Sequence, residues 1–172
     1  IYLIDSENVS GGISLLLLQA ARILKEAGNA GEAMAGIRKV ASRIQAVFLP
    51  DTLEYLRAGG RVSNAAYLGA SLLSVKPLIR IEDGALKASK KYRGRMEKVA
   101  FEVLDDYFRE CRPQKEEMIL FYVEGFSLEL LERLKQETLR RGVRRVLTFP
   151  IGCVISCHGG PGAFGIAGIR EE

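Results

Sequence analysis

Tryptophan is absent from this chain of 172 residues, histidine occurs once and cysteine three times. Three cysteines without paired spacing do not form a disulfide framework, so we expect reduced thiols and a cytoplasmic location. The longest apolar runs, such as MILFYV at 118–123, are far shorter than the roughly 20 residues that a membrane-spanning helix needs. No leader pattern opens the chain. The sequence therefore predicts no transmembrane segment, and leaves a peripheral membrane contact open.

The composition is that of an ordinary globular domain, with 48% hydrophobic and 27% charged residues. We expect one domain over residues 1–172. The chain opens with IYLID, which has the apolar character of a β-strand that begins before the first residue. This opening predicts a strand at 1–5 and a chain that is part of a longer protein.

Helical and extended segments alternate along the rest of the chain. Asp83-Gly84 is the pair that a type I′ turn requires, so residues 77–92 are expected to form a hairpin. Two short helices are expected around Gly59-Gly60. The fold class that follows is α/β, a two-layer mixed sheet with helices packed on it. The other expected helices are 14–27, 31–43, 94–110 and 127–141, and the other expected strands are 44–50, 118–123, 143–150, 153–156 and 164–169.

The single histidine lies in a glycine-rich stretch, SCHGGPGAFGIAG at 156–168. Gly160, Gly162 and Gly165 spell the dinucleotide-binding pattern, but too few residues follow for the helix and acidic residue that this site needs. His158-Gly159-Gly160 resembles the oxyanion loop of α/β-hydrolases, yet the chain has no G-x-S-x-G nucleophile motif. Neither enzyme class is supported.

Cys153 and Cys157 precede His158 with a spacing that fits neither c-type haem nor a four-ligand zinc site. In a strand, residues four apart share a face, so both thiols are expected to be small core side chains, and no metal is expected. What remains for this loop is either a tight structural turn or a ligand-binding turn, because glycine lets the backbone approach a ligand closely. The residues alone leave both open.

A basic cluster occupies residues 87–98, where six basic residues accompany one acidic residue. The net charge of +5 in this segment exceeds the +4 of the whole chain. Nucleic-acid binding is one interpretation of such a patch. The other interpretation is that the cluster docks an acidic protein surface. Tyr92 is the only aromatic residue among the cations, and no nucleic-acid recognition motif follows.

Three stretches together resemble the DegV family of bacterial fatty-acid-binding proteins. They are IDSENVSGG at 4–12, the long block from DTLEYLRAGGR to GRMEK at 51–98, and HGGPGAFGIAG at 158–168. Their order and spacing also agree, and the resemblance extends over nearly the whole chain. It implies the fold of the second, C-terminal domain of that family, with the first α/β/α domain absent apart from its last strand at 1–5.

The resemblance also implies a binding site for a long-chain fatty acid. Arg61 and His158 would hold the carboxylate, and Gly159 and Gly160 would let the backbone approach it. Charge-assisted donors of this kind are what a carboxylate removed from water requires. The apolar candidates to line a tunnel for the acyl chain are Leu53, Leu56, Leu68, Leu72 and Ile166.

Members of the family perform no chemistry themselves and present the fatty acid to a separate fatty acid kinase. The resemblance thus implies a bacterial protein of phospholipid metabolism that is not an enzyme, has no cofactor besides its lipid ligand and binds no specific nucleic acid. Lys90, Lys91, Arg93 and Arg95 would attract an acidic surface of the kinase. A nucleic-acid-binding or protein-docking module built on residues 87–98 is the alternative.

Overall fold

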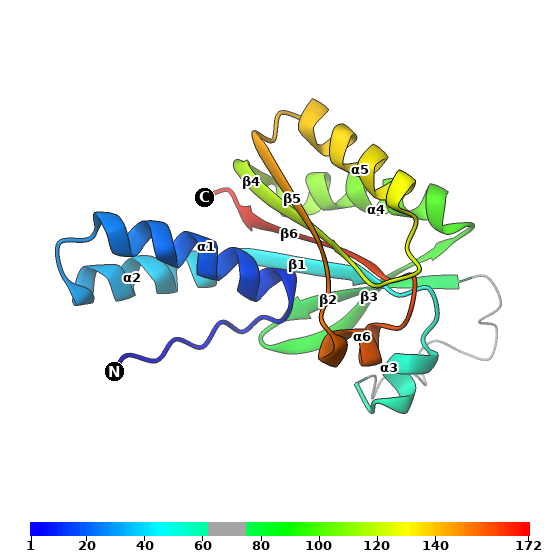
Figure 1. Cartoon of the computed structure of the whole chain (residues 1–172), viewed down its shortest axis with the longest axis horizontal. Helices are drawn as coiled ribbons and strands as arrows, with labels where there is room; N and C mark the ends of the chain where they lie inside the picture. The colour runs from blue at the N-terminus through cyan, green and yellow to red at the C-terminus, as the bar shows by residue number, and fades with distance from the viewer. Residues whose placement is uncertain (62–74) are drawn as a thin grey trace.

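The computed structural model describes residues 1–61 and 75–172, which build a mixed sheet flanked by helices (Figure 1). Its six strands stand in the order β3-β2-β1-β6-β4-β5. β4 and β5 are parallel, and the other neighbouring pairs are antiparallel. The strands are β1 (Ile44–Leu49), β2 (Val75–Glu82), β3 (Ala85–Arg93), β4 (Pro113–Tyr122), β5 (Arg145–Pro150) and β6 (Phe164–Arg170). The helices are α1 (Gly11–Glu26), α2 (Ala30–Ala41), α3 (Glu54–Ala58), α4 (Met96–Cys111), α5 (Leu128–Arg140) and α6 (Cys153–Gly159).

Helices cover both faces of the sheet. Side chains alternate along β4, so Met118 and Leu120 pack with residues of α4 and α5, whereas Ile119 and Phe121 pack with residues of α1 and α2. The mixed sheet with packed helices confirms the expected fold class, with a helical layer on each face instead of on one. Within the described ranges, no helix combines the length and the apolar character needed to cross a membrane.

Local sequence signals account for most of these elements. The Asn29 side chain accepts a hydrogen bond from the Glu32 amide at 2.9 Å and caps α2, and Ser127 caps α5 in the same way. Asp83 and Gly84 have φ of 53° and 69°, as a type I′ turn between β2 and β3 requires. The predicted hairpin and the predicted long helices are confirmed.

Two predicted strands are absent from the structure. Residues 1–5 pair with no strand of the described sheet, and Ile1, Tyr2 and Leu3 are exposed. A strand needs the backbone groups of a neighbour, which an apolar sequence alone does not supply. Residues 153–156 belong to helix α6 instead, because a short apolar run without further periodicity fits either element. The expected antiparallel pair of 153–156 with 164–169 therefore does not form.

β6 lies at the centre of the sheet, between β1 and β4. Gly165 on this strand leaves room for the ring of Phe121, since a Cβ at Gly165 would lie 2.2 Å from that ring. Gly11, at the start of α1, meets the same ring, with a corresponding distance of 2.3 Å. Because these two positions carry no side chain, α1 and β6 pack closely against the ring of Phe121.

A buried carboxylate holds α1 against β4 and β5. The side chain of Glu117 on β4 is 2% exposed. Its Oε1 lies 3.0 Å from a guanidinium nitrogen of Arg22 on α1 and 3.2 Å from Nε of Arg145 on β5. Gln19 donates to Oε2 of the same carboxylate. Both arginines are about half exposed, so the buried carboxylate of Glu117 is paired with two cations that remain in contact with water.

Candidate ligand-binding site

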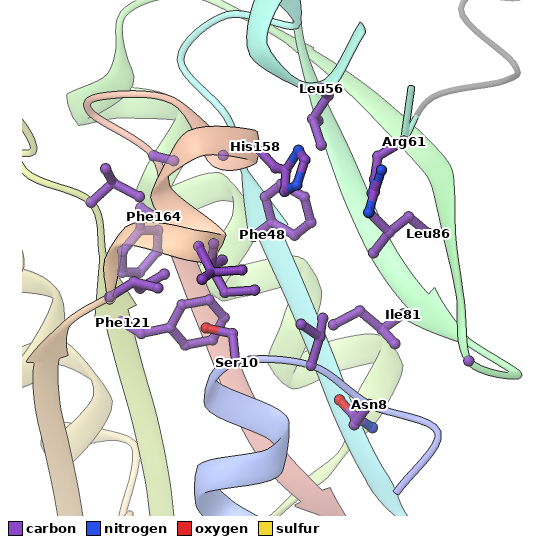
Figure 2. A pocket seen from close by; sticks show the side chains of 18 residues that line it. Asn8, Ser10, Phe48, Leu56, Arg61, Ile81, Leu86, Phe121, His158 and Phe164 are labelled. Carbon is purple, nitrogen blue, oxygen red and sulfur yellow. The ribbon is translucent and has the colours of Figure 1, made fainter. Parts of the chain in front are cut away.

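A cavity of about 310 Å³ lies against the α1 face of the sheet and is walled by α3, α6 and the hairpin of β2 and β3 (Figure 2). Its volume is in the range of small-molecule sites, and such sites are mostly apolar with a few convergent polar groups. The apolar part of this lining consists of Val9, Phe48, Leu56, Ile81, Leu86, Phe121, Val123, Ile151, Val154, Ile155, Ala163 and Phe164.

Three residues that line this cavity each carry a buried polar side-chain atom without a hydrogen-bond partner. These atoms are Oδ1 of Asn8, Oγ of Ser10 and Nδ1 of His158, and the described residues contain no other such atoms. Native proteins leave few buried polar atoms unpaired, because each costs about 1–3 kcal/mol. A second cavity of about 300 Å³, beside the starts of α4 and α5, is lined by none of the three. Of the two cavities, the one against α1 is therefore better suited to bind a polar atom of a ligand.

His158 reaches this cavity from the last turn of α6. Its ring lies close to Gly59, where a Cβ would be only 2.2 Å from Nδ1. A side chain at position 59 would therefore displace the imidazole. Gly160 follows with φ of 76° and ends the helix.

Arg61 lies beside His158 at the same end of the cavity (Figure 2). Its backbone amide bonds the Leu56 carbonyl at 2.9 Å, just after the turn at Gly60, whose φ is 65°. The guanidinium donates to the Gly59 carbonyl at 2.8 Å, and the residue is exposed. Among the described residues, no other group accepts a hydrogen bond from this guanidinium, whose remaining donors can therefore bind a ligand at the cavity mouth.

Asn8 and Ser10 lie at the other end of the cavity (Figure 2). Ser10 occupies the N-cap position of α1, yet its side chain makes no capping bond. Its φ of 55° and the φ of 47° at Glu7 are unusual for residues other than glycine. Gly12 leaves room for Asn8, because a Cβ there would lie 1.9 Å from Oδ1. Both side chains therefore lie at the wall of the cavity, beside the first turn of α1.

The predicted site residues divide between the cavity and its surroundings. His158, Arg61, Gly159 and Leu56 line the cavity. Three other candidates do not: Gly160 contacts the Tyr55 ring, Leu53 is buried in a small cluster with Leu56 and Ile79, and Ile166 packs in the core with α4 and α5. The tunnel prediction for Ile166 is wrong because strand alternation turns it to the opposite face from Phe121. Leu68 and Leu72 lie outside the described residues.

The thiols of α6 differ from expectation. Cys153 and Cys157 are exposed rather than buried, because the segment is a helix on the surface and not a strand in the sheet. All three cysteines are free, and Cys111 is buried. Within residues 1–61 and 75–172, no three histidine, cysteine or acidic side chains are placed to hold a metal ion.

Several cations of the basic cluster at 87–98 are paired with acidic side chains. Lys90 bonds Asp106 of α4, Lys87 bonds Asp83 at 2.9 Å, and Lys98 pairs with Glu102. This neutralisation leaves less positive charge for phosphate groups, so nucleic-acid binding is not favoured. Arg93 and Arg95 are exposed, and neither forms an ion pair with another described residue.

Asp106 joins the hairpin to α4. It accepts hydrogen bonds from Lys90 and from the Tyr92 hydroxyl, the latter at 2.6 Å. Burial acts to raise the pKa of this carboxyl, but these hydrogen bonds and the charges of Lys90 and Arg109 outweigh it and lower the pKa. Burial and the neighbouring Asp106 raise the pKa of Tyr92. The hydrogen bond between Tyr92 and Asp106 is thus a structural contact between β3 and α4.

Sequence reasoning did not identify Asn8 and Ser10 as site residues. A serine ahead of a helix ordinarily caps it, so its hydroxyl gave no sign of facing a cavity. Phe48 and Phe121 were expected only as strand residues, since an aromatic side chain in a strand is equally at home in a core. The one available signal was the position of Asn8 and Ser10 within the stretch IDSENVSGG.

Comparison with known proteins agrees with this architecture. A family model described as "Uncharacterised protein, DegV family" matches residues 1–171. A DegV domain-containing protein of Caldanaerobacter subterraneus is 32% identical over 170 residues, which cover 96% of this chain and 59% of that protein. The chain therefore spans about three fifths of the length of such relatives.

Solved structures show the same fold. A DegV family protein from Thermus thermophilus, described for its fatty acid binding, superposes with a TM-score of 0.83 at 26% identity, covering 99% of this chain and 61% of that one. A protein from Thermotoga maritima said to reveal fatty acid binding function has a TM-score of 0.78 at 28% identity, covering 99% and 59%. On the family model and these similarities, the chain belongs to the DegV family.

Proposed function

We propose that the protein binds a long-chain fatty acid in the cavity between α3, α6 and the β2–β3 hairpin. The acyl chain would lie along the apolar walls, and the carboxylate would lie beside Arg61 and His158. The observation that carries this proposal is the buried, unpartnered Nδ1 of His158, a residue that lines a mostly apolar cavity beside the guanidinium of Arg61.

The electrostatics of a carboxylate support this orientation. An anion removed from water requires charged or strongly polar donors, and an unpaired buried anion costs several kcal/mol. Arg61 is the one charged side chain in the described lining of the cavity. An imidazole can supply a second donor through Nδ1 when that nitrogen carries the proton. The lining at the other end offers neutral groups only.

Binding without catalysis is part of the same proposal. The Ser156 hydroxyl, two residues before His158, donates to the carbonyls of Ile151 and Gly152 and so is engaged with backbone. Neither this hydroxyl nor an exposed thiol of α6 forms a hydrogen bond to the imidazole within the described part of the chain. We propose that the protein acts as a lipid carrier in the cytoplasm, where free thiols such as those of its three cysteines persist.

The proposal predicts that the purified protein carries a fatty acid. Organic extraction followed by mass spectrometry should yield a long-chain acid in an amount approaching one per protein molecule, because a cavity lined mostly by apolar side chains favours an acyl chain. An extract without such an acid, together with no binding of added fatty acid in titration calorimetry, would contradict the proposal.

Presentation of the bound acid to a fatty acid kinase is the proposed next step, with Lys90, Lys91, Arg93 and Arg95 facing the kinase. Because Lys90 is engaged with Asp106, a clean test changes only Arg93→Glu and Arg95→Glu. We expect about tenfold slower association with the kinase at low salt, since rim charges act mainly on encounter rates. Stopped-flow association and acyl-phosphate formation measure this.

The matched control reverses two exposed cations elsewhere, Lys25→Glu and Arg38→Glu on α1 and α2. This control should leave the association rate nearly unchanged. Fatty-acid affinity should be the same in both variants. Loss of lipid binding on changing Arg93 and Arg95 would assign these residues to the pocket and exclude the docking role.

A further inference from the structure

The cavity has two polar ends, and the proposed carboxylate site uses only one of them. Asn8 and Ser10 line the end opposite Arg61 and His158, and Oδ1 of Asn8 and Oγ of Ser10 are buried without hydrogen-bond partners (Figure 2). A plain hydrocarbon chain would leave both atoms unpaired when it fills the cavity. Unpaired buried polar atoms are costly, so a ligand that pairs them is favoured over one that does not.

We infer that Asn8 and Ser10 form a second polar subsite that binds a hydroxyl group on the acyl chain, which makes long-chain hydroxy fatty acids the preferred ligand class. This inference rests on the proposed function, because it takes the carboxylate to lie beside Arg61 and His158.

The chemistry of the two side chains matches a hydroxyl group. Oδ1 of Asn8 only accepts a hydrogen bond, whereas the Ser10 hydroxyl can donate one. A ligand hydroxyl both donates and accepts, so it can pair with either of the two atoms. The described lining at this end carries no charged side chain, which disfavours a second carboxylate or an ammonium group there.

The local backbone holds both side chains at the wall of the cavity. Ser6 Oγ accepts a hydrogen bond from the Asn8 amide at 3.3 Å, and Glu7 N–H donates to Asp5 Oδ1 at 2.9 Å. These bonds brace the turn that carries Asn8. Ser10, which could cap α1, leaves its hydroxyl unbonded. The hydroxyl is therefore available to a ligand without breaking a contact of the fold.

The test compares stearic acid with hydroxystearic acids that carry the hydroxyl near the carboxylate, in mid-chain or near the methyl end. In the full-length protein, at least one positional isomer should bind about fivefold to tenfold tighter than stearic acid, as one or two net hydrogen bonds provide. Combined Ser10→Ala and Asn8→Ala should abolish this preference and leave stearic acid binding within about twofold. Ser42→Ala, at the exposed end of α2, is the matched control and should keep the preference.

The outcomes separate this inference from the proposed function. If stearic acid binds but no hydroxylated isomer binds more tightly, the subsite holds only water and the inference is overturned while fatty-acid binding stands. A preference that survives both alanine substitutions also overturns it. If no acid binds at all, the proposed function and the inference fail together. Should the double variant fold poorly, Ser10→Ala alone, which removes no protein hydrogen bond, gives the same comparison.

Discussion

Removing Arg61 and His158 together is expected to weaken fatty-acid binding by about a hundredfold. Each would donate a hydrogen bond to a carboxylate, and a bond to a charged group is worth about 1.5–3 kcal/mol, although two neighbouring donors do not add fully. His158→Ala alone should cost about tenfold or more. Titration calorimetry with a long-chain acid in the full-length protein measures both losses.

A fatty alcohol of the same length distinguishes headgroup recognition from support of the fold. The alcohol has no charge, so the Arg61→Ala, His158→Ala variant should bind it only a few times more weakly. Arg57→Ala, on the exposed side of α3, is the control and should change neither affinity. If acid and alcohol lose affinity equally and the melting temperature falls, His158 only braces the turn between α6 and β6, and the proposed headgroup site is wrong.

Replacing both arginines over Glu117 is expected to destabilise the fold by about 3 kcal/mol. Arg22→Met with Arg145→Met leaves a 2% exposed carboxylate without its cations, and an uncompensated buried charge typically costs about 3–5 kcal/mol. We expect the lower end because water reaches both arginines. Urea denaturation with an unchanged m-value measures the loss.

A rescue variant makes this stability prediction specific. Adding Glu117→Gln to the double variant removes the buried charge and should restore most of the lost free energy. Glu117→Gln alone should cost only about 1 kcal/mol, because the two arginines turn to solvent. The control, Lys98→Met with Arg140→Met, removes two exposed ion pairs and should have nearly no effect. No rescue by Glu117→Gln would show that the arginines act through their packing.

The arrangement of α6 shows where local reasoning about the site was insufficient. The sequence singled out His158 within a glycine-rich stretch, and the structure places it in the last turn of α6. The sequence also predicted a strand at 153–156, which placed Cys153 and Cys157 in the core. The structure forms a surface helix there, because residues beyond β5 leave the sheet and bond within their own turn, Ser156 N–H to the Gly152 carbonyl at 3.1 Å. The four residues 153–156 do not contain that information on their own.

The sequence by itself determined the elements whose signals are local. Asn29 and Ser127 begin helices, Asp83-Gly84 closes the hairpin, and the stretches at 4–12, 51–98 and 158–168 identified the family, because caps, turns and motifs act over a few neighbouring residues. Tertiary structure alone decided which surfaces meet. It placed β6 between β1 and β4, turned Ile166 away from the cavity and left Ser10 and Asn8 facing it. Strand order and side-chain partners depend on contacts between residues far apart in the chain, and no local pattern specifies them.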